Sequence, residues 1–156
     1  MKKTNVKSIT YASIIAALYV VLTFIANSMG LASGAIQIRI SETLTILPVF
    51  TSAAIPGLFV GCLISNIITG SVIWDVIFGS IATLIGATGT YALRKHKWLA
   101  PVPPILANAL IVPPVLIYAY GATEALPYLI LTVGIGEVIS AGVLGMLLYT
   151  SLSKHK

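Results

Sequence analysis

Two oppositely charged side chains stand three residues apart in the segment AIQIRISETLTILP, residues 35–48. Arg39 and Glu42 flank the start of an apolar run, in a chain with only 8% charged residues. A pair at this spacing is typical of a local ion pair at the start of a helix. It is equally typical of a polar ligand site at the edge of a membrane, and the residue types leave both interpretations open.

A further carboxylate, Glu137, lies inside the apolar segment LTVGIGEVISAGVLGMLLYT. A carboxylate at that depth in a bilayer is costly unless it is paired, protonated or facing a wet cavity. No basic residue lies at its depth in any predicted helix. We therefore interpret Glu137 as a substrate-binding residue.

The remaining polar and aromatic candidates each have a structural alternative. Asn66 and Asn108 are amides within apolar helices, and Asn108 could simply satisfy a backbone carbonyl that nearby prolines leave free. Asp75 suits the first turn of a helix as well as a binding site. Trp74 and Tyr118 suit an interfacial aromatic belt as well as a ligand cage.

The elements that position these residues follow from composition. The chain is 58% hydrophobic, its mean hydropathy is +1.02, and it has four acidic residues in 156. Such a chain is an all-α integral membrane protein, with spans of about 20 residues each. We expect a single transmembrane domain over 1–156 with helices at 8–29, 43–55, 58–69, 74–92, 102–119 and 127–151. The second and third are short, either tilted crossings or a re-entrant hairpin around a turn at Pro56–Gly57.

Basic residues predict the orientation of the six helices. Eight of the nine lie in three clusters, namely Lys2, Lys3 and Lys7, then Arg94, Lys95 and Lys97, then Lys154 and Lys156. The positive-inside rule makes all three clusters, and hence both termini, cytoplasmic in a multi-pass protein of the cell membrane. The net charge of +5 is thus an orientation signal and no indication of nucleic acid. The loops at 30–40, 70–74 and 121–125 then face outside, with Arg39, Glu42 and Asp75 at the outer edge.

Motifs for catalysis are missing from the sequence. It has no HExxH zinc motif, no cysteine and histidine cluster, no phosphate-binding loop and no nucleophile elbow. We expect no catalytic residue, no metal site and no cofactor in this chain. An outward-facing site that binds a small, flat, polar ligand fits better than an enzyme.

Two blocks of sequence carry a family resemblance. QIRISETLTILPVFTSAAIPGLFVGCLISNI at 37–67 and WDVIFGSIATLIGA at 74–87 resemble the QueT family of predicted queuosine-precursor transporters. Members of that family are substrate-binding S components of energy-coupling factor (ECF) transporters. The resemblance implies the six-helix S-component fold. It also implies a transmembrane coupling subunit and two ATPase subunits as partners, which would use the ATP.

The resemblance also implies a partner interface on the first helix. The segment ASIIA places the small residues Ala12 and Ala16 one turn apart, as in the Ala-x-x-x-Ala pattern of S components. Small residues let helices approach closely. Packing within the chain is the alternative for these two alanines.

Queuosine precursors are 7-deazaguanines, such as preQ1, preQ0 or queuine, and their edges suggest roles for the candidates. Glu137 would accept from the ring N–H and the exocyclic amine together, and Asn108 would pair with the carbonyl edge. Tyr118 or Trp74 would stack on the ring. Asp75 or Glu42 would pair with an aminomethyl arm.

The Arg39–Glu42 pair would then form the hinge of a lid over the site. Its mutual charge would keep the open lid solvated. Two other functions stay open: an S component for a different vitamin, and a stand-alone small carrier or channel without ATPase partners.

Overall fold

A computed structural model describes residues 6–32 and 36–154 of the chain. The basic residues Lys2, Lys3 and Lys156 lie outside the described residues. Every regular element in the described part is helical. In chain order these are α1 (Val6–Ser28), η1 (Ile40–Val49), α2 (Ala54–Ile68), α3 (Ile73–Ala92), α4 (Val102–Tyr120), α5 (Leu126–Glu137), η2 (Val138–Leu144) and α6 (Gly145–Ser153).

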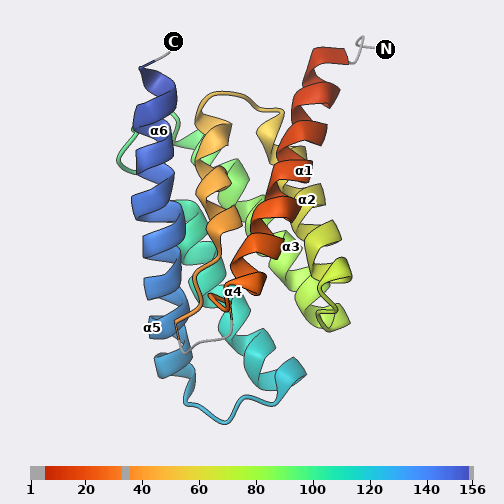
Figure 1. Cartoon of the computed structure of the whole chain (residues 1–156). Helices are drawn as coiled ribbons and strands as arrows, with labels where there is room; N and C mark the ends of the chain where they lie inside the picture. Colours follow the sequence, from red (N-terminus) through yellow and green to blue (C-terminus); the bar gives the residue numbers. More distant parts are fainter. Residues whose placement is uncertain (1–5, 33–35, 155–156) are drawn as a thin grey trace.

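The helices form one bundle whose connections lie at its two ends (Figure 1). The start of α1, the α3–α4 connection and the end of α6 lie at the same end. The connections after α1, between α2 and α3, and between α4 and α5 lie at the other, which we call the cavity end. The described members of the three basic clusters therefore gather at one end, as predicted. Their cytoplasmic orientation stays a prediction.

Four segments are long and apolar enough to cross a membrane. They are α1, α3, α4 and the continuous stretch Leu126–Ser153, which joins α5, η2 and α6. The predicted helices at 8–29, 74–92, 102–119 and 127–151 are thereby confirmed to within a few residues. The two shorter apolar helices are η1 and α2, so the count of six crossings stays a prediction.

The predicted helix at 43–55 and the turn at Pro56–Gly57 are wrong. The chain forms a ten-residue 3₁₀ helix at Ile40–Val49, and α2 begins at Ala54. Pro48 has no N–H to donate to the carbonyl of Leu44, so it cannot complete an α-helical ladder there. Pro56 falls in the first turn of α2, where a missing N–H costs nothing, and therefore starts the helix instead of breaking it.

Small residues bring α1 and α2 into close contact. A methyl group built on Gly57 would lie 2.7 Å from the carbonyl oxygen of Ala12, and one on Gly61 would lie 3.0 Å from that of Ala16. Ala12 and Ala16 therefore pack against α2 inside the chain, which corrects their prediction as a partner interface. Ser13 and Ala17, beside them in the sequence, are exposed.

The two helices that are not α-helical pack against each other. The hydroxyl of Thr43 in η1 donates to the carbonyl oxygen of Ser140 in η2, at 3.4 Å. Gly136, just before η2, lies against the backbone carbonyl of Gln37 with no room for a side chain between them. Irregular backbone at membrane depth is tolerated where it is buried in protein or lines a cavity. The contact at Gly136 thus fixes the segment that leads into η1.

Substituting Gly136 tests this contact. We expect Gly136→Ala to lower the free energy of unfolding by about 1–3 kcal/mol, because the added methyl meets the backbone of Gln37. The matched control is Gly134→Ala on the same helix, where the nearest atom is the Ala109 methyl at 3.8 Å. Thermal unfolding of both detergent-purified variants measures the difference, and equal midpoints would show that the packing at Gly136 is looser than described.

Candidate functional site

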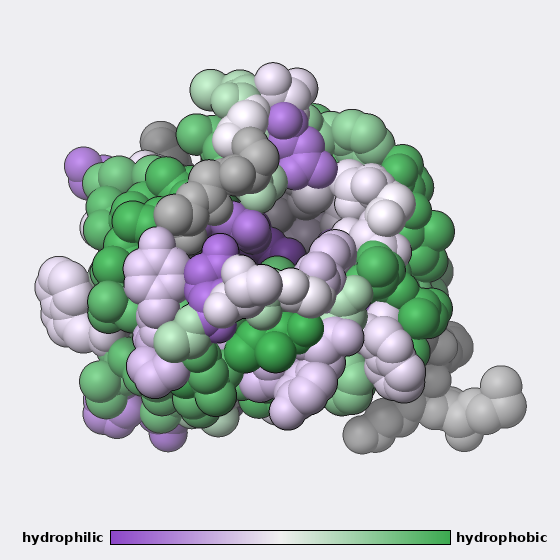
Figure 2. Space-filling view, turned by 90° about the horizontal axis from the view of Figure 1, so that it is seen from below, coloured by the Kyte–Doolittle hydropathy of each residue, from purple (hydrophilic) through white to green (hydrophobic). Residues whose placement is uncertain are grey.

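A cavity of about 410 Å³ opens at the cavity end of the bundle. Figure 2 shows hydrophilic side chains gathered in a hollow there, with hydrophobic side chains around the outside. Most residues on its wall are polar, and they come from α1, the segment before η1, η1 itself, α2, α3 and α4. The polar set is Tyr19, Thr23, Asn27, Gln37, Arg39, Ser41, Ser65, Asn66, Thr69, Ser71, Asp75 and Tyr120.

Asp75 anchors one side of the cavity. The Tyr120 hydroxyl donates to its Oδ2 at 3.0 Å, and the Val72 amide donates to the Tyr120 oxygen at 3.4 Å. The Asn66 Nδ2 donates to the Asp75 carbonyl at 3.4 Å. Asp75 is 6% exposed and Asn66 is 6% exposed. These bonds join α2 and α4 to the start of α3 at Asp75, and the predicted site residues Asn66 and Asp75 do line the cavity.

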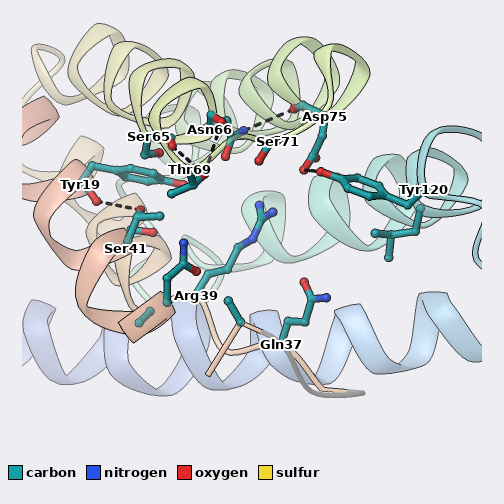
Figure 3. Close-up of a pocket in the computed structure, with 15 residues that line it drawn as sticks. Tyr19, Gln37, Arg39, Ser41, Ser65, Asn66, Thr69, Ser71, Asp75 and Tyr120 are labelled. Carbon is teal, nitrogen blue, oxygen red and sulfur yellow. Dashed lines mark hydrogen bonds between the residues drawn. The ribbon is translucent and has the colours of Figure 1, made fainter. Parts of the chain in front are cut away.

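Arg39 supplies the positive charge. It precedes η1 in an extended conformation, and its half-buried side chain reaches into the cavity between Gln37 and the α2–α3 wall (Figure 3). Burial disfavours the charged guanidinium, but the carboxylate of Asp75 outweighs this, so the pKa of Arg39 lies above its ordinary value. Arg39 therefore lines the site as a permanent cation.

Glu42 lies in the protein core and not at the outer edge, which corrects the prediction of a solvated hinge. It is 0% exposed, and the hydroxyl of Tyr19 donates a hydrogen bond to its Oε1. Its Oε2 has no hydrogen-bond partner within the described chain. The ion pair expected between Arg39 and Glu42 is not formed. Arg39 precedes η1 in an extended conformation and lines the cavity, whereas Glu42 lies in the first turn of η1 and is buried.

Glu137 and Asn108 join Glu42 in a buried acidic cluster, the name used here for these three residues. Glu137 is 4% exposed and Asn108 is 0% exposed. Electrostatic interaction links Glu137 with Glu42, and the Asn108 side chain interacts with both. Nδ2 of Asn108 donates to the Pro104 carbonyl at 3.1 Å. The structure thus brings together three of the predicted site residues from three different elements.

A small slot beside Glu137 shares two of its wall residues with the cavity. Glu137 faces a slot of about 10 Å³ whose other walls are Gln37, Arg39, Val112 and Val133. Gln37 and Arg39 also line the cavity. The slot is near the smallest volume that holds one water molecule. Arg39 and Gln37 therefore separate the cavity from the acidic cluster.

Trp74 and Tyr118 do not reach the cavity. They are 56% and 89% exposed and line a separate apolar groove on α3 and α4. Trp74 stacks on Phe78, with ring centroids 6.1 Å apart. The stacking role predicted for Trp74 and Tyr118 is therefore not available in this arrangement. Their exposure favours the interfacial belt that was the alternative.

Sequence reasoning missed much of the cavity wall. Tyr19 and Tyr120 are its aromatic residues, and Gln37, Ser41 and Ser65 add polar groups. One available signal was the spacing of Tyr19, Thr23 and Asn27, which repeats every four residues along an otherwise apolar helix. Such spacing places polar groups on one helix face.

Fold and cavity together define a class: a helical, multi-pass membrane protein with a polar hollow at one end. Residues 9–154 match the family described as QueT transporter. The chain belongs to the QueT transporter family, which covers nearly its whole length.

A curated relative agrees with this membership. The chain is 40% identical over 65 residues to the "Queuosine precursor transporter QueT" of Lactococcus lactis subsp. cremoris (strain MG1363). The matched stretch covers 42% of this chain and 38% of that protein. No solved structure matches the chain.

Replacing Tyr19 tests the support of the buried carboxylate. We expect Tyr19→Phe to lower the free energy of unfolding by about 1–3 kcal/mol, because Glu42 loses its hydrogen-bond donor. Tyr128→Phe, at a residue 48% exposed, is the control. Adding Glu42→Gln should recover part of the loss by removing the charge. Thermal unfolding in detergent compares the unaltered protein, the two single variants and the double variant. If adding Glu42→Gln does not restore any stability, the loss in Tyr19→Phe does not come from the Glu42 carboxylate.

Proposed function

We propose that the chain takes up a queuosine precursor, a 7-deazaguanine, as the substrate-binding S component of an ECF transporter. Membership of the QueT transporter family and the name of the Lactococcus relative support the substrate class. The observation that carries the proposal is the polar cavity, where this apolar bundle brings together Arg39, Asp75 and their hydrogen-bonding neighbours. Asp75 on its wall can pair with an amine, and the hydroxyl and amide groups beside it can pair with polar edges of a ring.

The size and lining of the cavity suit such a ligand. Its volume of about 410 Å³ lies within the range of about 300–1,000 Å³ typical of small-molecule sites. Hydroxyl, amide and carboxylate groups offer partners to the edges of a heterocycle. The rings of Tyr19 and Tyr120 replace Trp74 and Tyr118 as candidates for contact with the ring face.

Charge in the cavity favours a precursor with an amine. Asp75 is nearly buried and lies on the wall, where a primary ammonium group would form a strong charge-assisted hydrogen bond with its carboxylate. The nitrile form offers no cation and gains nothing from Asp75. We therefore propose that Asp75, held by Tyr120, selects the aminomethyl form.

Transport requires partners that this chain does not supply. The sequence has no phosphate-binding loop, so ATP would be used by ATPase subunits and coupled through a transmembrane subunit. Since Ala12 and Ala16 pack against α2, the neighbouring small residues Ser13 and Ala17, which are exposed and one turn apart, are open to a partner. We propose this exposed strip as the approach for the coupling subunit.

Calorimetric titration tests ligand binding. We expect saturable binding of the aminomethyl and nitrile 7-deazaguanines and no binding of riboflavin or thiamine. Asp75→Asn should lower the affinity for the aminomethyl form by about 10- to 100-fold and the affinity for the nitrile form by less than about 3-fold. Calorimetry is preferred to tryptophan fluorescence because Trp74 lies outside the cavity and Trp98 is 74% exposed. Binding of a vitamin instead would contradict the substrate assignment.

Co-purification tests the partners. We expect the tagged chain, co-expressed with a coupling subunit and two ATPase subunits, to retain all three in detergent. Ala17→Leu should reduce the retained ATPase because a bulky side chain blocks close helix approach. Thr88→Leu, at an exposed position on α3, is the control. Transport by the chain alone in liposomes, without ATPase subunits, would contradict the S-component assignment and favour a stand-alone carrier.

A further inference from the structure

The acidic cluster has more hydrogen-bond acceptors than donors. Four buried side-chain atoms have no hydrogen-bond partner within the described residues: Glu42 Oε2, Asn108 Oδ1, Glu137 Oε2 and Ser140 Oγ. Three of the four are amide or carboxyl oxygens, which accept hydrogen bonds when the carboxyl groups are ionised. Buried polar groups are almost always hydrogen-bonded, so each exception needs an explanation. A guest that donates several hydrogen bonds would supply it.

The backbone around the cluster is built from the two irregular helices. Glu42 lies in the 3₁₀ helix η1, and Glu137 ends α5 directly before the π-helix η2. Long 3₁₀ stretches and π-helical turns are uncommon and frequently mark functional sites. In membrane transporters, interrupted helices near the centre of the bundle commonly form the substrate site. The acidic cluster therefore lies on irregular helices of the kind that commonly form ligand sites.

We propose that the acidic cluster is a second, inner subsite that binds the donor edge of a 2-amino-4-oxopyrimidine ring. That edge carries a ring N–H next to an exocyclic amine, and carboxylates accept from such a pair in a bidentate manner. Glu137 and Glu42 accept from the edge, and Asn108 fixes the geometry between them. This inference rests on the proposed function and adds which edge of the ligand is bound deepest in the protein.

Entry to the subsite requires a movement of two side chains. The slot beside Glu137 is about 10 Å³, too small for a ring, and Arg39 and Gln37 close it on the cavity side. The backbone of Gln37 is held against Gly136, so the backbone does not provide the opening. The side chains of Arg39 and Gln37 rotate instead, and Arg39 turns toward Asp75, the carboxylate across the cavity. The ring then lies in the cavity with its donor edge in the cluster.

Removing one group from the ligand tests the subsite on the unaltered protein. Calorimetry compares the nitrile 7-deazaguanine with its analogue that lacks only the 2-amino group. We expect the analogue to bind about 10- to 100-fold more weakly, the usual effect of a lost hydrogen bond to a charged group. Because no substitution is made, this comparison does not depend on the folding of a variant.

A variant then assigns the effect to the cluster. We expect Glu137→Gln to lower the affinity for the nitrile ligand by about 10- to 100-fold. The affinities of the variant for the nitrile ligand and for its analogue without the 2-amino group should then differ by less than about 3-fold. Glu124→Gln, in the exposed α4–α5 connection, should leave both affinities unchanged. Each titration is repeated with choline chloride in place of sodium chloride, because a set of oxygen ligands also suits a cation.

The outcomes separate this inference from the proposed function. If no 7-deazaguanine binds, the proposed function fails. If the nitrile ligand binds but neither loss of the 2-amino group nor Glu137→Gln changes its affinity by more than about 3-fold, the inner subsite is overturned and the proposed function stands. Binding that requires sodium and ignores the 2-amino group would make the cluster a cation site and likewise overturn the inference.

Discussion

Burial of the Glu42 carboxylate is the constraint on which the centre of this protein depends. A fully buried charge among apolar helices is tolerated only with hydrogen bonds and nearby opposite charge. Tyr19 of α1 supplies the hydrogen bond, and Arg39 supplies the charge. Tyr19 thereby ties α1 to η1. The close contact at Gly61 packs α1 against α2, and the contact at Gly136 packs the segment before η1 against α5.

The 3₁₀ form of η1, in which Pro48 prevents a complete α-helical ladder, affects how far this segment reaches. A 3₁₀ helix has about three residues per turn and rises about 2 Å per residue, compared with about 1.5 Å for an α-helix. Ten residues in this form extend further across the bundle than an α-helix of the same length. Arg39 lies just before η1 in an extended conformation, whereas Glu42 lies in the first turn of η1. The chain thereby presents one charge to the cavity and buries the other.

The four long helices were predictable because their apolar runs are long enough to span a membrane. The clusters of basic residues predicted which helix ends lie at the same end of the bundle. Glu137 was predictable as a buried polar residue, since no basic residue lies at its depth in the sequence. Asn108 had a structural alternative, and its amide does donate to the backbone carbonyl of Pro104. The course of η1 was not predicted: the sequence indicates an α-helix containing Pro48 and a turn at Pro56, whereas Pro48 lies in a 3₁₀ helix and Pro56 lies in the first turn of α2. Ala12 and Ala16 failed for a related reason. A pattern of small residues predicts that another helix approaches closely but does not identify that helix, which here is α2.

Charge balance connects the cavity with the acidic cluster. Among the described residues, Arg39 is the cation that faces Asp75, Glu42 and Glu137, so the interior holds more carboxylates than cations. One guanidinium cannot neutralise three carboxylates, and buried like charges repel strongly where water is excluded. A protonated carboxyl group or a cationic guest relieves this imbalance. A ligand with an ammonium arm and a donor-rich ring edge relieves it at both ends, because the arm meets Asp75 while the edge meets the acceptors behind Arg39. The position of the Arg39 side chain then decides whether the cavity and the acidic cluster act as one site.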